Sequence, residues 1–407
     1  MGVLDVSHAG FGAWCLRREC ALFGEVAVRK QIISTRENLW RHACCRDSGR
    51  WLMANERITS VDVARRAGVS QSAVSRFFTP GSSVSKKTAD KIRRAAEELG
   101  YRPNVLARSL ITGKSRIIGL VVGYLENYFY PEVVERLSKQ LQTEGYHVLV
   151  FISPLGGDNI EQTVQEILDY QVDGIVLASV TMSSGLAARC HAAGVPVVLF
   201  NRKQDDDRLS AVTSNNYAGG RAVADHLLAL GHRRMGYIAG FEGASTQRDR
   251  ERGFRDALAA AGFELAAREV GNFVYGEAQA AARRMFSAVD RPEAVFVCND
   301  HMAFAVMDVL RFELGLRVPQ DVSVVGFDDV PPARWAAYNL TTYRQNVDDM
   351  VAETVRTLLD NINLKSEMPR QVMLDGEFVV RGSTGSASPA NATGESGPSA
   401  APRSEIA

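Results

Sequence analysis

The sequence predicts a small basic all-α domain followed by a large α/β body of two doubly wound parallel-sheet subdomains. Between residues 116 and 380, apolar runs typical of strands alternate with amphipathic segments typical of helices. This alternation indicates parallel sheets that are covered by helices on both faces. It occurs in two successive halves, which predicts two subdomains, and the helix-like segments ahead of it contain no comparable strand run.

Charge is distributed unevenly along the 407 residues, although Lys and Arg equal Asp and Glu at 47 each. Residues 54–116 carry 13 Lys and Arg against 5 Asp and Glu, whereas residues 117–407 carry 26 against 37. A small basic module on an acidic body favours binding of a polyanion; a basic surface that meets only solvent is the alternative. No apolar run reaches the roughly 18 residues of a membrane span, so we expect a soluble protein with no membrane partner.

The first 53 residues differ from the rest of the chain. They show no helical or strand period, and they hold four of the six cysteines, Cys15, Cys20, Cys44 and Cys45. The cysteine spacing matches no common zinc pattern, so we predict no metal site. No disulfide framework is indicated, which suits a reducing cytoplasm. We expect residues 1–53 to be a disordered extension or the product of a start-site artefact.

The basic module, residues 57–103, should contain three helices. The first is ITSVDVARRAG, in which Thr59 is the expected N-cap and Gly68 closes the turn. Val61 and Ala64 are expected to point inward. The second helix is SQSAVSRFF, and the third runs through KKTADKIRRAAEEL, with serines as N-caps of both.

A helix, a glycine-containing turn and a short polar helix form the helix-turn-helix pattern. In that motif the N-terminal residues of the second helix contact base edges in the major groove. Gln pairs with adenine and Arg with guanine in bidentate fashion, so the pattern indicates DNA binding; an accidental glycine turn in a small three-helix domain is the alternative. The residues concerned are Gln71, Ser72, Ser75 and Arg76.

The body can be divided into strands and helices by its apolar periodicity. In the first half, strands are expected at 117–122, 147–152, 174–178 and 195–200, and helices at 131–144, 158–170 and 184–193. In the second half, strands are expected at 235–240, 270–274, 294–298 and 322–327, and helices at 246–261, 277–287 and 301–314. A ligand cleft should lie between the halves, outside the carboxyl ends of the strands. The Pro/Gly-rich tail, 383–407, should be disordered.

The run TSVDVARRAGVSQSAVSRFF…VSKKTADKIRRAAEELGYRPNVLARSLITGKSRIIGLVV resembles the lactose-repressor (LacI/GalR) family of bacterial transcription regulators. The pattern D-V-A-x-x-A-G-V-S-x-x-x-V-S-R is present as Asp62 through Arg76, and the likeness extends to about Arg381. It implies a helix-turn-helix headpiece, a hinge helix at 104–115 and a core at 116–382. The core would resemble type I periplasmic-binding-protein domains, with the chain crossing between subdomains near 214 and 343.

The resemblance also implies DNA contacts. Thr59 and Ser70 would touch phosphates, and the recognition-helix residues already named would read bases. The hinge contacts would be Asn104, Ala107 and Leu110, the last as a wedge in the minor groove. Many members have an Asn-Gly-like turn after the recognition helix, whereas this chain has Phe77-Phe78-Thr79-Pro80-Gly81. A role for Thr79 in DNA contact is therefore left open.

The signatures QRDRERGFRDAL, FVCND and VPQDVSVVGFDD carry the resemblance into the expected cleft. Arginine, carboxylate, amide and aromatic groups together suit a sugar or another polyhydroxylated ligand. Each residue has a structural alternative: Asn299 could cap a helix, Arg250 could form a surface ion pair, and Phe129 could belong to the core. The implied ligand residues are Tyr128, Phe129, Asn201, Arg250, Asn299 and Asp328.

These observations predict a cytoplasmic, ligand-responsive repressor that binds a pseudo-palindromic operator as a homodimer and needs no cofactor. The tail lacks leucine heptads, so we expect a dimer and no tetramer. An extracytoplasmic solute-binding protein is the second hypothesis; the absent signal peptide and the basic headpiece argue against it. An enzyme is the third, but no nucleophile elbow, P-loop or G-x-G-x-x-G after a strand is present. Whether the ligand is an inducer or a corepressor is open.

Overall fold

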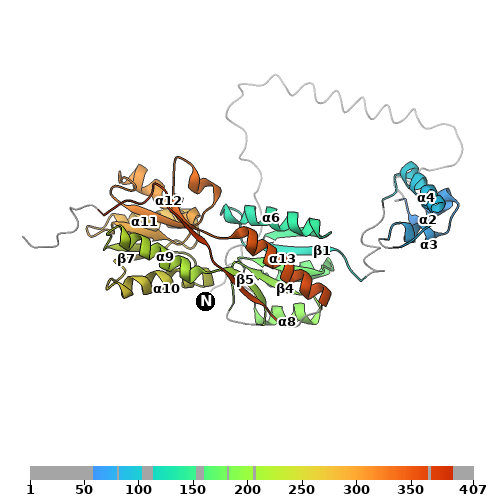
Figure 1. The fold of residues 1–407 in the computed structure, drawn as a ribbon, viewed down its shortest axis with the longest axis horizontal. Helices are drawn as coiled ribbons and strands as arrows, with labels where there is room; N and C mark the ends of the chain where they lie inside the picture. Colours follow the sequence, from blue (N-terminus) through green and yellow to red (C-terminus); the bar gives the residue numbers. More distant parts are fainter. Residues whose placement is uncertain are drawn as a thin grey trace, which may run out of the picture. The chain divides into compact units, whose positions relative to one another are not determined.

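The computed structural model describes residues 58–79, 82–102, 113–152, 160–180, 183–204, 208–364 and 368–387. The chain divides into two compact units, one ending at Arg102 and the other starting at Pro103. We call the first unit the headpiece and the second the core (Figure 1). The expected hinge contacts Asn104, Ala107 and Leu110 lie outside the described residues, and so does the expected extension at 1–53.

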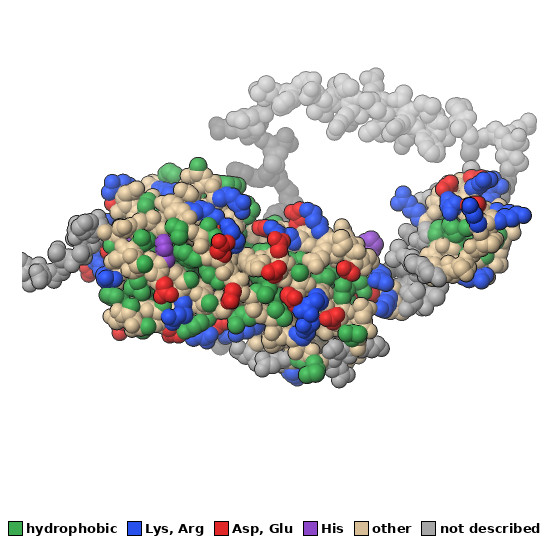
Figure 2. Space-filling model, viewed as in Figure 1, with side chains coloured by type: hydrophobic (Ala, Val, Ile, Leu, Met, Phe, Trp, Pro, Cys, Tyr) green, Lys and Arg blue, Asp and Glu red, His purple; other side chains and the backbone are tan. Residues whose placement is uncertain are grey.

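The headpiece consists of three helices, α2 (Ser60–Ala67), α3 (Gln71–Phe77) and α4 (Lys86–Leu99). Their small core is centred on side chains that are fully buried, Val63, Val74 and Ile92. The expectation that Val61 points inward is wrong, because this side chain is 45% exposed. Helix α2 buries Val63 in its place, whereas Ala64 is buried as expected. Figure 2 shows Lys and Arg side chains at several edges of the visible headpiece surface.

The expected helix ends of the headpiece are confirmed. The Asp62 carboxylate accepts hydrogen bonds from the Thr59 backbone N–H (3.0 Å) and hydroxyl (2.7 Å) at the start of α2. Gly68 follows α2 with φ +66°, a left-handed conformation that glycine adopts without steric cost. The Ser70 hydroxyl accepts from the Ala73 N–H and so caps α3. These caps fix the angle at which α3 leaves the turn.

The core contains two six-stranded sheets, and we call the units built on them lobe 1 and lobe 2 (Figure 1). The lobe 1 sheet has the order β11-β5-β4-β3-β1-β2, and all its neighbouring strands are parallel. Its strands are β1 (Ile117–Val122), β2 (His147–Ile152), β3 (Gly174–Ala178), β4 (Val197–Phe200), β5 (Ser210–Ser214) and β11 (Gln371–Leu374). Its helices are α6 (Phe129–Thr143), α7 (Ile160–Asp169), α8 (Ser184–Ala192) and α13 (Val347–Leu364).

The lobe 2 sheet has the corresponding order β12-β10-β9-β8-β6-β7, in which only β12 runs antiparallel to its neighbour. Its strands are β6 (Met235–Ala239), β7 (Ala267–Val270), β8 (Ala294–Val297), β9 (Ser323–Asp328), β10 (Thr341–Arg344) and β12 (Glu377–Val379). Its helices are α9 (Asn216–Ala229), α10 (Ser245–Ala260), α11 (Tyr275–Phe286) and α12 (Asp300–Asp308), with a π-helical turn at Val309–Glu313 and a 3-10 turn at Pro331–Arg334.

The chain passes between the lobes at three places within the described residues. It leaves β5 for α9 at Asn215, returns after β10 at 345–346, and passes from β11 to β12 at 375–376. The sequence placed crossings near 214 and 343 and gave no sign of the third. Each crossing is short, so both lobes are tied together at one side of the core.

Two expectations for lobe 2 are wrong. A strand was expected at 270–274, but β7 ends at Val270 because Asn272 and Phe273 have φ values of +51° and +64°, outside the strand region. The tail, 383–407, was expected to be disordered, yet residues 383–387 are packed on lobe 2; residues 388–407 lie outside the described residues. The buried Ser383 hydroxyl donates to the Val324 carbonyl (2.6 Å) and accepts from the Thr341 N–H (2.7 Å).

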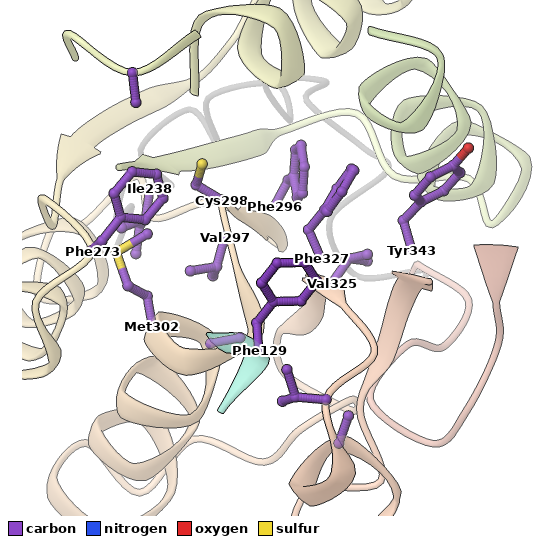
Figure 3. Packing of buried hydrophobic residues seen from close by; sticks show 14 of the residues in the cluster. Phe129, Ile238, Phe273, Phe296, Val297, Cys298, Met302, Val325, Phe327 and Tyr343 are labelled. Atoms are coloured by element: carbon purple, nitrogen blue, oxygen red, sulfur yellow. The ribbon is translucent and has the colours of Figure 1, made fainter. Parts of the chain in front are cut away.

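The largest hydrophobic cluster runs through both lobes. Figure 3 shows part of it, with Phe129, Phe273 and Phe327 among the buried side chains. Continuous apolar strands such as IIGLVV in β1 are buried because helices cover both faces of the sheet. Among the described helices, none is long and apolar enough to cross a membrane.

Helices α9 and α10 approach each other so closely that only glycine fits at their contact. A Cβ atom on Gly220 would lie 2.1 Å from the Arg250 carbonyl oxygen. A Cβ atom on Gly253 would lie 2.1 Å from the Tyr217 carbonyl oxygen. The two glycines thus allow the backbone contact that fixes α10, the helix that carries Arg250.

Candidate functional site

The first candidate site is the exposed face of α3 in the headpiece. Gln71, Ser72, Ser75 and Arg76 are all exposed, whereas Ala73 and Val74 between them are buried. Positions i, i+1, i+4 and i+5 lie on one side of a helix, so the four polar side chains form a single face. Thr59 and Ser70, the expected phosphate contacts, are exposed at the N-termini of α2 and α3.

Hydrogen bonds order several of these side chains before any ligand arrives. The Gln71 amide donates to the Ser60 hydroxyl (3.2 Å), and the hydroxyls of Ser70 and Ser72 lie 3.0 Å apart. The Arg76 Nε–H donates to the Ser72 carbonyl at 3.4 Å, which leaves its terminal nitrogens directed away from that bond. A face that carries one amide group, on Gln71, and one guanidinium group, on Arg76, can pair with base edges.

Aromatic side chains support the opposite side of α3. The Phe77 and Phe78 rings meet edge to face at 4.8 Å, and the Phe78 ring lies 5.6 Å from that of Tyr101. The Arg93 guanidinium lies over the Phe77 ring at 5.8 Å. Both phenylalanines therefore act as anchors for a short helix that has few other apolar residues.

The turn after α3 departs from the common family pattern, and the structure shows what Thr79 does there. Its hydroxyl donates to the Ser75 carbonyl at 2.8 Å, and its N–H donates to the Arg76 carbonyl at 3.1 Å. These bonds satisfy carbonyl groups that the end of a helix leaves open. Thr79 thus terminates α3, while Pro80 and Gly81 lie outside the described residues.

The second candidate site lies where the carboxyl ends of the two core sheets adjoin; we call it the inter-lobe site. At its centre on lobe 2 is Arg250, which is 2% exposed. Its guanidinium donates to Asn216 Oδ1 (2.8 Å), to the Cys298 carbonyl (2.6 Å) and, at 3.4 Å, to Asp328 Oδ1. It also stacks on the Phe327 ring, 3.6 Å from the centroid. The alternative of a surface ion pair is therefore wrong.

Asp328 is the acidic partner of Arg250. Burial raises the pKa of this carboxyl to about 6, against the opposing effect of the Arg250 guanidinium. Gln345 donates to the same oxygen at 2.7 Å. The backbone at Asp328 and Asp329 has φ values of +123° and +57°, which non-glycine residues seldom adopt and which concentrate at functional sites.

Asp329, next in the chain, has a structural role. Its carboxylate accepts from Arg344 Nε at 2.7 Å and from Arg381 Nη2 at 2.6 Å. These two ion pairs join the loop after β9 to β10 and to the segment that follows β12.

Asn201 and Arg202 face lobe 2 from the end of β4. Asn201 has φ +70°, and its amide donates to the Tyr130 hydroxyl at 3.1 Å. The Arg202 guanidinium lies 5.5 Å from the centroid of the Phe273 ring of lobe 2. The following residue, Lys203, donates from its N–H to the Ser245 hydroxyl (3.0 Å) and forms an ion pair with Asp249 (3.4 Å). This segment thus contacts the second lobe directly.

The remaining expected ligand residues occupy different environments. Asn299 Oδ1 accepts from the Met302 N–H at 3.0 Å and caps α12, while its Nδ2 is free for a ligand. Tyr128 is 47% exposed at the start of α6. Phe129 is 1% exposed and packs against Tyr130 and Phe200, with ring centroids 5.3 and 6.4 Å away. This packing is that of a core residue, which was the structural alternative for Phe129.

Several buried polar atoms near this junction have no hydrogen-bond partner among the described residues. Such atoms are costly to bury and often mark the place of a ligand. They are Asn201 Oδ1, Arg202 Nε, Asn299 Nδ2, His301 Nε2 and Gln345 Oε1. The sequence did not identify four residues of this junction, Arg202, Phe273, His301 and Gln345. The only sequence signal for them was their position shortly after a strand or at the start of a helix, near the carboxyl edge of a sheet.

A cavity of about 450 Å³ opens beside the inter-lobe site, next to the chain crossings. Several of its charged side chains pair with each other: Arg136 with Glu132 and Asp348, and Arg344 with Asp329 and Glu377. In the part of the chain that the structure describes, no cluster of His, Cys, Asp and Glu could hold a metal ion.

Comparisons with known proteins find relatives of both the headpiece and the core. Residues 59–104 match the family model of bacterial regulatory proteins, lacI family, and residues 224–384 match that of the periplasmic binding protein-like domain. The HTH-type transcriptional regulator CelR of Thermobifida fusca is 34% identical over 328 residues, which are 78% of this chain and 96% of the relative.

Solved structures show the same likeness. A CelR–cellobiose complex superposes with a TM-score of 0.62 at 32% identity, covering 80% of this chain and all of that chain. The lac repressor dimer bound to operator and the anti-inducer ONPF gives a TM-score of 0.74 at 28% identity, covering 81% of this chain and all of that one.

Proposed function

The chain belongs to the LacI family of bacterial regulatory proteins, and we propose that it represses transcription by binding a pseudo-palindromic operator as a homodimer under control of a small ligand. The relatives are transcriptional regulators, which supports a regulator without enzymatic activity that acts in the cytoplasm. One observation carries the proposal: the four polar side chains of α3 form one exposed face on a capped helix-turn-helix unit.

Each of these side chains has a role in the proposal. Gln71 and Arg76 read bases, with Ser72 and Ser75 between them, while Thr59 and Ser70 hold phosphates at helix N-termini. Asn104, Ala107 and Leu110 in the hinge segment add minor-groove contacts. A homodimer presents two recognition helices to two half-sites, which explains an operator with two-fold symmetry.

The effector binds at the inter-lobe site. Arg250, Asp328, Asn299 and Asn201 are its polar contacts, with Tyr128 as the aromatic side. One relative was solved with cellobiose and another with the anti-inducer ONPF, which supports a sugar-like ligand here. A ligand that contacts both lobes favours one arrangement of them over others, and the hinge segment at 104–115 passes that preference to the DNA-binding unit.

Operator binding tests the proposal. Genomic fragments bound by the full chain are selected, and affinity for the selected site is then measured by fluorescence anisotropy at several salt concentrations. The logarithm of affinity should fall steeply with the logarithm of salt concentration, because bound Lys and Arg release counterions from DNA. A chain that selects no sequence contradicts the proposal.

Arg76→Ala should weaken specific binding by about 1–3 kcal/mol and relax selectivity at one base position. Arg283→Ala is the matched control, because it removes an equal charge from the exposed Arg283–Glu313 pair in the core. The recognition-helix assignment is wrong if both variants bind the operator as the unchanged protein does.

Addition of ligand then distinguishes an inducer, which lowers operator affinity, from a corepressor, which raises it.

A further inference from the structure

Arg202 carries a buried positive charge that no described residue neutralises. Arg202 and Arg250 are the two buried arginines of the described chain, 8% and 2% exposed. Arg250 donates three hydrogen bonds, one of them to its acidic partner Asp328. Within the described ranges Arg202 has no such ion pair; its Nε has no hydrogen-bond partner, and its guanidinium contacts the Phe273 ring.

The surroundings hold this guanidinium at the junction of the lobes. Phe273 is brought there by its left-handed backbone, and its ring fits because Gly240 has no side chain: a Cβ atom there would lie 2.2 Å from the ring. On the lobe 1 side, Arg202 acts electrostatically on the hydroxyls of Tyr124 and Tyr130. Neither tyrosine carries a negative charge near neutral pH, because burial raises both pKa values.

A buried charge without a partner is strongly unfavourable, and burial is normally accompanied by pairing. The burial of the Arg202 charge is explained if the ligand itself supplies the negatively charged partner. A neutral hydroxyl would accept a hydrogen bond but would leave the charge uncompensated. A carboxylate or phosphate would neutralise it and match the planar guanidinium with two parallel hydrogen bonds.

We infer that the effector is anionic, a polyhydroxylated molecule with one carboxylate or phosphate group, and that Arg202 binds this group. The inference deepens the proposed function and rests on it, since it names the ligand class of the same inter-lobe site. The unpartnered Asn201 Oδ1, Asn299 Nδ2 and Gln345 Oε1 then serve the hydroxyl groups. Arg250 is neutralised by Asp328, and its three hydrogen bonds to described residues leave two of its five N–H donors for the hydroxyl groups as well.

The test uses matched neutral and anionic sugars on the full chain. The pairs are glucose and glucuronate, galactose and galacturonate, glucitol and gluconate, and glucose and glucose 6-phosphate, at equal ionic strength. Affinity is measured by calorimetric titration after a thermal-shift screen. In a pair that binds, the anion should bind at least tenfold more tightly than its neutral partner, and the uronate and phosphate arms distinguish the two acid groups. Equal or tighter binding of the neutral sugar overturns the inference.

Variants show whether the preference for the anion depends on Arg202, and their melting temperatures test the inference even if none of the sugar pairs binds. Arg202→Gln should abolish the preference for the anion and should raise the melting temperature of the ligand-free protein, because an uncompensated buried charge is removed. A lower melting temperature, or an unchanged preference, overturns the inference. Arg283→Gln, in an exposed ion pair with Glu313, is the control for the change in net charge and should do neither.

A further variant tests the aspartates at 205–207, which follow in the sequence and lie outside the described residues. Changing all three to asparagine should leave the preference intact; a manyfold gain in anion affinity would mean that they neutralise Arg202, and the inference fails. Operator binding of the unchanged protein is measured in parallel. Loss of that binding refutes the proposed function, whereas the sugar pairs decide the ligand class.

Discussion

At the scale of single residues, the core buries an aspartate next to its binding site. Asp300 is fully buried, accepts from the Thr342 hydroxyl (2.6 Å) and the Val330 N–H (3.0 Å), and has no ion pair among the described residues. Burial raises its pKa to about 7, and the nearby Asp328 adds to this. These hydrogen bonds hold strand β10 and the loop after β9 against the start of α12, so the carboxyl is structural and yet titrates near neutrality.

Asp300 should make stability depend on pH. The pKa of Asp300 in the folded protein lies above its unfolded value of about 3.9. Its contribution to stability is therefore fully present below about pH 3.9 and is lost as the pH rises through about 7. Relative to Asp300→Asn, the unchanged protein should gain about 2 kcal/mol of unfolding free energy between pH 8 and pH 5.5. Denaturant titrations at both pH values measure this difference, and effects of the buried histidines cancel because both proteins contain them. Parallel pH profiles would contradict the assignment.

Residue identity alone predicted some of these details. Caps were predictable because Ser, Thr and Gly have local roles at helix ends, and Thr59, Ser70 and Gly68 have them in the structure. Contacts between lobes were not predictable, because they depend on distant elements. Arg202 follows Asn201 in the sequence, but only the fold brings Phe273 to its guanidinium. Likewise Phe129 could be either core or ligand residue until its packing against Phe200 was known.

At the scale of elements, the backbone contact between α9 and α10 determines where Arg250 stands. Gly253 is buried one helical turn after Arg250 and touches the backbone of α9. Any side chain there must push the two helices apart, since the contact is with a carbonyl group and not with a flexible side chain.

Gly253→Ala should therefore lower the free energy of unfolding by about 3 kcal/mol, at the upper end for overpacking. It should also weaken effector binding, because α10 moves with Arg250. Gly276→Ala on α11 is the control: a Cβ atom there meets nothing within 4 Å, so alanine should be neutral or stabilising by up to about 1 kcal/mol. Urea denaturation of both variants measures the effects. If both glycines tolerate alanine equally, the close contact does not govern stability.

Most elements predicted from the periodicity are present, but six elements of the described core were not predicted: helices α9 and α13 and strands β5, β10, β11 and β12. In a helix as short as α2, apolar residues spaced by three or four positions can be assigned to either of two neighbouring faces. Val61 was therefore predicted to be in the core, whereas Val63 is the buried residue. Expected helix 301–314 is α12 with its last turn widened into a π-helix. Residues 383–387 pack through hydroxyl and backbone hydrogen bonds that composition cannot reveal.

At the scale of the whole molecule, the distribution of apolar clusters indicates how cooperatively the chain unfolds. One cluster contains Leu120 and Val198 of lobe 1 together with Tyr237 and Phe296 of lobe 2. The headpiece has a separate small cluster around Val63. The lobes should therefore unfold together, and the headpiece separately.

Calorimetry of the full chain should show one large transition for the core and a separate weaker one for the headpiece, which is near the size at which a domain is only marginally stable. The van't Hoff and calorimetric enthalpies of the large transition should agree, as for two-state unfolding. The variant Val74→Ala assigns the weaker transition to the headpiece, because it should lower the melting temperature of that transition alone. Two separate core transitions would show that the lobes are energetically independent.

The third crossing has a consequence for synthesis on the ribosome. Strands β11 and β12 complete the two sheets, one each, and both come from the last described stretch of the chain. The sheets of lobes 1 and 2 cannot acquire their final strands until translation has passed residues 374 and 379, respectively, whereas the headpiece helices are all complete by Leu99. Domains fold as units while the chain emerges. A nascent chain is thus expected to present a folded recognition helix well before it has the finished core that would regulate it.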